Sequence, residues 1–455
     1  MSKRTVHIGC GAGFAGDRTD AAGPVVDSLI ADGAPSFLIF ETLAERTLAQ
    51  AQLRHNSHGG TGYLPSMLTF VGPVLERCLR NGIRIVGNFG AADPLGAAKA
   101  LRELMDQTGF SDKSIGVVLG DNLLESLSPD DIRQWPLEGA AQELSSAKVV
   151  AANAYLGAEP IAEALNLGAQ IVVTGRVADP SLTLGPLVHH FNWSWTDWDR
   201  LAGGTLAGHL LECGAQVTGG YFADPGVKDV PGLADLGYPI AEVMEDGSMV
   251  LGKAKGTGGM VSLATVKEQI LYEIHDPSAY LTPDVILDIT EVQISQQSPD
   301  RVAISGARGR TRPDRLKTTI CMAGGWMGEG EISYAGPNAF RRAELAIEIL
   351  KARVRKLDPS IPAHFDIIGY SSIFSGSTGL HQPVANRVNA QDVRVRLATR
   401  GVDRKLVERT VAEVEALYTT GPAGGGGVRL HVTENLDTAS CLIDRDLTVP
   451  RVKLI

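Results

Sequence analysis

The sequence predicts an α/β fold, with a doubly wound, mainly parallel sheet in the first domain and an α+β second domain. Short continuous apolar runs recur near residues 5–9, 36–40, 83–87, 115–119, 148–152 and 170–174. Helical patterns lie between these runs, as in parallel sheets whose two faces are covered by helices. After about residue 200, alternating patterns with occasional helices replace the continuous runs. We therefore expect domains at 1–275 and 276–455.

Local signals define several helices of this fold. Asp93 and Pro94 are typical of an N-cap and a first helical position, and they predict a helix over 94–108. A shorter helix is expected over 160–167. In the second half, the expected helices are 205–216, 260–274, 338–356 and 402–418. The alternating segments 302–306, 317–322, 330–334, 365–369 and 391–397 predict strands.

Composition narrows the class of protein. The 455 residues include 42 Lys and Arg against 52 Asp and Glu, a formal charge of −10, which disfavours a nucleic-acid partner. The five cysteines form no CxxC pair, so we expect reduced thiols and no zinc site. No apolar run is long enough to span a membrane, and the N-terminus has no signal-peptide pattern. We expect a cytoplasmic protein with no membrane partner.

Polar and charged clusters follow four of the predicted strands. In open parallel sheets, ligands bind just beyond the carboxyl ends of the strands, so these clusters outline a candidate site. A buried arginine such as Arg176 needs an anionic partner, and a substrate carboxylate or phosphate would serve. Glu41 could bind a ligand or abstract a proton, or it could simply stabilise a helix start. The strand-end candidates are Gly11, Gly13, Asp17, Arg18, Glu41, Asn88 and Arg176.

The turn at 11–16 matches the dinucleotide fingerprint GxGxxG, and Glu41 stands where a ribose-binding acid would lie. This keeps an NAD-dependent oxidoreductase as an alternative. Asp17 follows the glycines where a helix should begin, however, and its carboxylate would face a pyrophosphate. A glycine-rich turn that presents Asp17 and Arg18 to another ligand is the preferred interpretation.

Two further motifs lie beyond residue 200. His209 and Glu212 are three residues apart on an expected helix, a spacing suited to proton transfer, although the same helix could also be a core helix. Cys213 adjoins this pair, and a thiol nucleophile remains open. No third ligand is fixed by spacing, so we expect no metal. Gly258 and Gly259 precede a helix and could bind an anion through backbone amides, or form a tight turn.

The sequence resembles the acyclic terpene utilisation AtuA family along nearly its whole length. The segments that carry the resemblance are 8–18, 40–47, 88–92, 174–182, 208–216 and 256–259. The resemblance implies a bacterial catabolic setting, often beside acyl-CoA carboxylases and hydratases, without fixing a reaction.

Together these observations predict a catabolic enzyme that acts on a small organic acid or its acyl-CoA thioester. The expected acid/base step is that of a lyase, hydratase or hydrolase, with Glu41, His209 and Glu212 moving protons. No sequence signature fixes a cofactor, and coenzyme A would enter as part of the substrate. The alternatives are the NAD-dependent oxidoreductase and a non-catalytic scaffold for carboxylase pathway enzymes. We also expect a homo-oligomer. A tryptophan cluster at 193–198 could form its interface or cover an apolar substrate chain.

Overall fold

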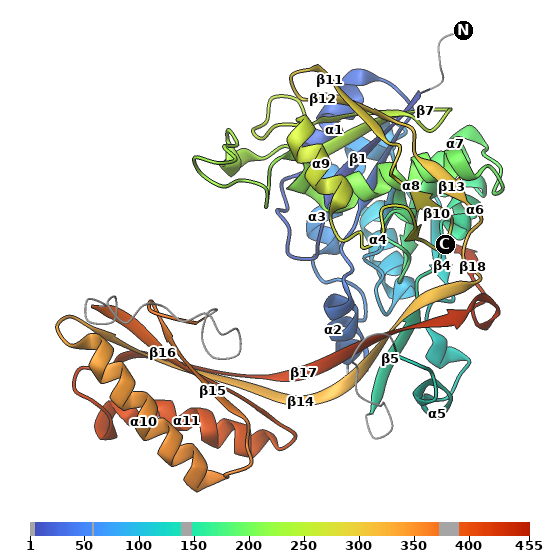
Figure 1. Cartoon of the computed structure of the whole chain (residues 1–455). Helices are drawn as coiled ribbons and strands as arrows, with labels where there is room; N and C mark the ends of the chain where they lie inside the picture. Colours follow the sequence, from blue (N-terminus) through green and yellow to red (C-terminus); the bar gives the residue numbers. More distant parts are fainter. Residues whose placement is uncertain (1–4, 57–58, 138–147, 373–390) are drawn as a thin grey trace. The chain divides into compact units, whose positions relative to one another are not determined.

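A ten-stranded mixed sheet organises the larger part of the chain (Figure 1). The computed structural model describes residues 5–56, 59–137, 148–372 and 391–455. In spatial order, the strands are β11 (Gln293–Ser298), β12 (Arg301–Ser305), β8 (Met249–Lys253), β7 (Pro239–Met244), β1 (Thr5–Ala12), β2 (Ser36–Phe40), β3 (Arg84–Gly87), β6 (Ile171–Thr174), β4 (Ile115–Leu119) and β18 (Arg451–Leu454).

Within the described part of this sheet, the adjacent strands β1, β2, β3, β6 and β4 pair in parallel. The neighbours on either side pair antiparallel. Short connections such as the one between β7 and β8 form hairpins, whereas a parallel pair needs a crossover, usually a helix. The fold is therefore mixed α/β, as the sequence predicts, but the sheet is less uniformly parallel than expected.

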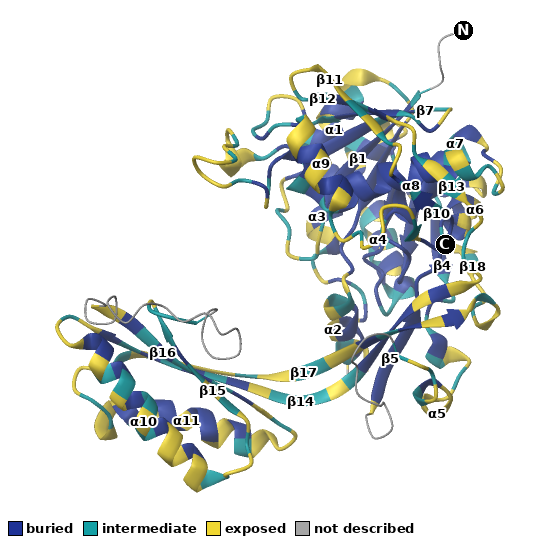
Figure 2. Ribbon diagram, viewed as in Figure 1, coloured by how far each residue is buried: buried dark blue, intermediate teal, exposed yellow. Residues whose placement is uncertain are grey.

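Two groups of helices pack on this sheet. One group is α1 (Ala22–Asp32), α3 (Met67–Arg80) and α4 (Pro94–Gln107), and the other is α6 (Glu159–Asn166), α7 (Ser181–Phe191) and α8 (Trp198–Glu212). The helices and the buried central strands enclose one large apolar core (Figure 2). The other α-helices in the described part of this region are α2 (Glu45–Asn56), α5 (Pro129–Arg133) and α9 (Leu263–Leu271).

The run at 148–152 forms a strand, but not in the expected sheet. β5 (Val149–Ala154) pairs with β14 (Arg315–Ala335), and the N–H of Tyr155, just beyond β5, donates to the carbonyl of Lys317 at 2.9 Å. An apolar run indicates burial, but it does not reveal which strand becomes the partner. A separate small antiparallel sheet contains β9 (Tyr280–Leu281), β10 (Ile286–Asp288) and β13 (Arg308–Arg310).

The chain divides into two compact units. Unit 1 comprises Met1–Cys321 and Thr438–Ile455, and unit 2 comprises Met322–Asp437. The expected boundary at 275/276 differs from this division because β11 and β12 extend the large sheet, and β10 and β13 pack on α8. Residues 276–321 therefore belong with the first unit.

Unit 2 has the order strand–helix–strand–strand–helix–strand, with its own apolar core. Its sheet runs β15 (Ala363–Ile368), β16 (Asp392–Gly401), β14, β17 (Gly426–Asp444). The helices α10 (Ala339–Leu357) and α11 (Arg404–Thr420) pack on each other and on β16. This is the split βαβ arrangement of ferredoxin-like folds.

None of the helices in the described parts of the chain combines the length and the apolar character needed to cross a lipid bilayer. The tryptophan cluster is not a free surface. Trp193 is buried, stacks on Phe191 and donates to the carbonyl of Glu245, while Trp195 and Trp198 pack against the main core. These side chains stabilise unit 1 internally.

Candidate active site

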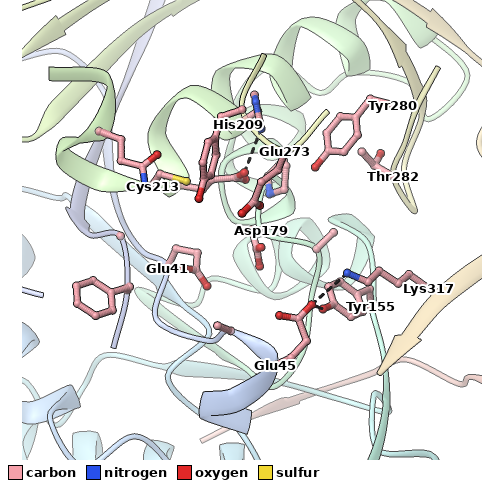
Figure 3. Close-up of a pocket in the computed structure, with 18 of the residues that line it drawn as sticks. Glu41, Glu45, Tyr155, Asp179, His209, Cys213, Glu273, Tyr280, Thr282 and Lys317 are labelled. Carbon is pink, nitrogen blue, oxygen red and sulfur yellow. Dashed lines mark hydrogen bonds and ion pairs between the residues drawn. The ribbon is translucent and has the colours of Figure 1, made fainter. Parts of the chain in front are cut away.

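A cavity of about 630 Å³ lies in unit 1, where the turns after β1, β2 and β6 meet α8 (Figure 3). This volume suits a small organic ligand. Carboxylates and tyrosines dominate its wall, and Arg315 and Lys317 supply cations. The carboxylates are Asp17, Glu41, Glu45, Asp179, Glu212 and Glu273, and the tyrosines are Tyr155, Tyr221, Tyr238, Tyr272 and Tyr280.

Glu41 follows the last residue of β2 and is buried at the cavity wall. Its Oε1 atom accepts the N–H of Leu43 at 2.8 Å and the side-chain amide of Asn88 at 2.9 Å. Burial raises the pKa of Glu41, although the charge of Arg176 and the hydrogen bond from Asn88 act in the opposite direction. The carboxyl group therefore holds a proton at a higher pH than an exposed glutamate does.

Asn88 supports Glu41 without lining the cavity itself. Its Oδ1 atom accepts the N–H of Thr42 at 2.8 Å, while its Nδ2 group donates to Glu41. The side chain is fully buried. Asn88 thus fixes both the backbone and the carboxyl group at the end of β2, a different role from the expected direct contact with a ligand.

His209 and Glu212 form the expected pair on α8. His209 Nδ1 lies 3.1 Å from Glu212 Oε1, and Nε2 lies 2.9 Å from the backbone carbonyl of Gln269. Burial lowers the pKa of His209, but the hydrogen bond and the charge of Glu212 outweigh this effect and raise it. Both ring nitrogens are therefore engaged by acceptors, which suits a charged imidazolium.

Of these two side chains, Glu212 is the one with an atom left free to contact a substrate. Its Oε1 atom is held by His209, whereas Oε2 is buried at the cavity wall with no hydrogen-bond partner among the described residues. A buried carboxylate oxygen without a donor is costly, and a ligand donor would relieve that cost. The geometry leaves Oε2 of Glu212 available for a substrate.

A second polar cluster lies on the other side of the view, formed by Tyr155, Glu45 and Lys317 (Figure 3). The hydroxyl of Tyr155 donates to Glu45 Oε1 at 2.5 Å, and Lys317 Nζ lies 3.1 Å from the same atom. Burial raises the pKa of Glu45, but Tyr155 and Lys317 outweigh it and bring the pKa to about 2. Glu45 therefore stays ionised and balances the charge of Lys317.

Sequence reasoning missed Tyr155. Lys317 stands out in the sequence only as part of a basic cluster at 308–317, which fits a solvated loop as well as an anion clamp. The contact between the two residues depends on the pairing of β5 with β14, two segments far apart in the chain. The lysine ammonium also lies 4.7 Å from the centre of the Tyr155 ring, and the Arg176 guanidinium lies 4.4 Å from it. Only the tertiary structure brings these cations to one aromatic ring.

Arg176 is buried and engaged by the protein itself. Its guanidinium donates to the carbonyls of Val177 and Leu43 and forms an ion pair with Asp179. Arg176 does not line the cavity, whereas Asp179 does. The arginine therefore joins the turn after β6 to the turn after β2, and its observed anionic partner is a protein carboxylate.

The turn after β1 is closed by its own contacts. The N–H of Gly13, a donor that a pyrophosphate would use, instead donates to Asp17 Oδ2 at 2.7 Å. A Cβ atom on Gly13 would lie 2.4 Å from the backbone of Gly214, so this glycine permits close packing. Gly11 likewise makes room for the ring of Phe40. Among these residues, Gly13 and Asp17 line the cavity.

Arg18, Gly258 and Gly259 lie outside the cavity wall. Arg18 pairs with Asp20 at 2.9 Å and donates to the carbonyl of Leu236. The N–H groups of Gly258 and Gly259 donate at 2.7 Å to backbone carbonyls of residues 235 and 231. These amides hold a tight loop, which agrees with the simpler of the two interpretations of this motif.

Comparison with known protein families identifies the family of this chain. The model described as "Acyclic terpene utilisation family protein AtuA" matches residues 6–454. The chain belongs to the AtuA family. This confirms the resemblance noted in the sequence and connects the chain with acyclic terpene utilisation, a catabolic role.

Other comparisons add little to the AtuA family assignment. None of the curated proteins matches the chain significantly. Among solved structures, the chain is similar to "De novo designed protein Ferredog-Diesel", at 17% identity and a TM-score of 0.16. The match covers 24% of this chain and 85% of the designed protein.

Cys213 also lines the cavity of this AtuA family member. Burial is the main influence on its thiol and raises the pKa well above the ordinary value, with the charge of Glu212 acting in the same direction. A neutral thiol is a weak nucleophile, so the electrostatics disfavour the thiolate that the sequence left open. In the described segments, no group of three or more His, Cys, Asp or Glu side chains is arranged to hold a metal ion.

Proposed function

We propose that this chain is a catabolic enzyme that acts on a small organic acid or its acyl-CoA thioester by acid/base chemistry. The observation that carries the proposal is the buried carboxyl group of Glu41. Two donors fix its Oε1 atom, burial raises its pKa, and it faces a cavity of suitable volume. General bases and acids work best when their pKa is moved toward the working pH.

Glu41 and Glu212 are the proton-transfer groups in this proposal. As a carboxylate, Glu41 accepts a proton from the carbon next to a carbonyl group, or from an attacking water molecule. Glu212 Oε2 receives or returns the second proton. His209 is a positioning residue, since its two ring nitrogens are bonded to Glu212 and to the carbonyl of Gln269. Its hydrogen bond to Oε1 of Glu212 leaves Oε2 of the same carboxyl group facing the cavity.

The substrate's anionic group is assigned to Lys317 and Arg315. Both line the cavity and are about half exposed, so a ligand arriving from solvent meets them and competes with their carboxylate partners, Glu45 and Asp444. Phe14 and Leu281 also line the cavity and are largely exposed, which favours an apolar chain in the same ligand. Arg176 and Asn88 act indirectly, by fixing the turns that carry Glu41 and Asp179.

A thermal-shift screen against acyl-CoA thioesters, short di- and tricarboxylates and NAD(P) tests the proposal. A ligand at a hundred times its dissociation constant stabilises the folded state by about 2.7 kcal/mol, which is readily measured. We expect stabilisation by a thioester or an acid, and loss of that effect in Lys317→Met. Stabilisation by NAD alone would favour the oxidoreductase, and no response at all would favour the scaffold.

Turnover of the ligand found in this way tests the roles of the residues. We expect Glu41→Gln to reduce kcat by at least about a hundredfold, the usual contribution of one acid/base group, while ligand binding persists. Glu163→Gln provides the matched control, because Glu163 is an exposed glutamate on α6, away from the cavity. Wild-type turnover in Glu41→Gln would remove Glu41 from the mechanism.

A further inference from the structure

Strand β17 forms an open edge of the unit 2 sheet. The sheet order places β17 last, beside β14, and no strand in the described ranges pairs with its outer side (Figure 1). Natural edge strands are usually kept short or protected by lysine, proline or a bulge. Residues 426–437 of β17 contain neither lysine nor proline. A long edge without lysine or proline is suited to pairing with another strand.

The two faces of this edge differ in character. Val428 packs against the apolar core of unit 2, and side chains alternate along a strand. Leu430 and Leu436 therefore lie on the same face as Val428, and Leu430 is 40% exposed. Arg429 and Asp437 are exposed on the opposite face. The face of Val428 thus carries mostly apolar side chains with one carboxylate, Glu434, while the opposite face carries the charged pair.

We propose that a second copy of this chain pairs with β17 in antiparallel register about a two-fold axis at Thr433. In this register, Arg429 lies opposite Asp437 of the partner subunit, and Leu430 lies opposite Leu436 of the partner subunit. Each pair occurs twice, as two-fold symmetry requires. Opposite charges and apolar side chains directly across a strand pair both stabilise it. The two unit 2 sheets join into one continuous sheet.

Neighbouring registers are less complementary. A two-fold axis at Val432 would place Arg429 opposite Asn435 of the partner subunit and Leu430 opposite a glutamate. An axis at Glu434 would bring two Glu434 carboxylates directly together, which is destabilising. Only the axis at Thr433 combines an ion pair with a leucine pair, and it also places Val432 opposite Glu434 of the partner subunit. Within that register, Asp437 also accepts a hydrogen bond from Asn435 of its own chain at 3.1 Å.

Sedimentation velocity of the full chain over a range of concentrations tests this interface. We expect a dimer for the wild type. Arg429→Asp places two carboxylates opposite each other, and Asp437→Arg places two guanidinium groups opposite each other. Each change should raise the dimer dissociation constant about tenfold or more. The double variant with both changes restores the ion pair in reversed order, and it should dimerise as the wild type does.

Arg409→Asp is the matched control, since Arg409 is an exposed arginine on α11, outside the strand edge. It should not change the dissociation constant. Circular dichroism melting of every variant separates lost pairing from lost folding. A monomeric wild type would overturn the proposal, and so would a dimer that both single variants leave intact. Failure of the double variant to recover would exclude the register at Thr433. These outcomes are independent of the catalytic proposal.

Discussion

At the scale of single residues, Asn88 determines how Glu41 holds its proton. We expect Asn88→Ala to raise the pKa of Glu41 further, because the removed hydrogen bond favours the ionised form. It should also lower the free energy of unfolding by about 1–3 kcal/mol, since Thr42 loses its acceptor as well. The pH titration of the Glu41 carboxyl carbon by NMR measures the first effect and urea unfolding the second. A lowered pKa would contradict this account.

Asp121 is a second buried carboxyl group with a distinct consequence. Its Oδ2 atom accepts the N–H of Arg176 and the amide of Asn153, yet burial dominates and raises its pKa from 3.8 to about 6. The folded state therefore binds this proton more tightly than the unfolded state does. The contribution of Asp121 to the free energy of unfolding is fully present below pH 3.8 and is lost as the pH rises to about 6.

We expect Asp121→Asn to remove that pH dependence. The amide oxygen can still accept both hydrogen bonds, but it carries no charge to bury. Above pH 6, the free energy of unfolding of the variant should exceed that of the wild type by about 3 kcal/mol. At low pH the two values should be equal. Urea unfolding at a series of pH values measures it. An equal effect of the substitution at pH 4 and pH 7 would show that Asp121 does not titrate as described.

At the scale of elements, local sequence signals predict where a helix begins, but they do not predict which distant strands pair. Helix α4 begins where Asp93 and Pro94 predict it, and Asp93 Oδ1 accepts the N–H of Gly96 at 2.8 Å. We expect Asp93→Ala to lower the free energy of unfolding by about 1 kcal/mol, measured by urea unfolding. Asp93→Asn should retain most of the stability, because asparagine also caps helices. Equal losses in both variants would contradict the capping role.

Strand-end placement explains why part of the site was predictable. Glu41 and the His209–Glu212 pair lie at the cavity because the ends of parallel strands meet at one edge and a helix presents every third residue on one face. Arg18, Gly258 and Gly259 lie outside the cavity wall, and their donors form hydrogen bonds within loops. The contact between Lys317 and Tyr155 could not be predicted, because no local pattern encodes the pairing of β5 with β14.

At the scale of the whole molecule, each unit has its own core, so each should respond to its own mutations. Leu350 is fully buried in the core of unit 2. We expect Leu350→Ala to lower the free energy of unfolding of that unit by about 2–5 kcal/mol while unit 1 is unaffected. Differential scanning calorimetry should show one displaced and one unchanged transition. Leu38→Ala, in the core of unit 1, should give the opposite pattern.

A single displaced transition that included both units would instead show that they unfold together. The sequence predicted a second domain, but it did not predict which residues belong to each unit. The change from continuous to alternating apolar patterns indicated a second domain. The assignment of 276–321 to unit 1 depends on hydrogen bonds between β12 and β8, which no composition change marks.

The order in which the chain passes through its two units has a consequence for biosynthesis. A ribosome completes residues 322–437 before it has made Thr438–Ile455, which belong to unit 1 and include strand β18 beside β4. The nested unit can therefore finish folding while its host still lacks an outer strand of the large sheet. During that interval, the edge of β4 is unprotected, and nascent chains would be most prone to aggregate there.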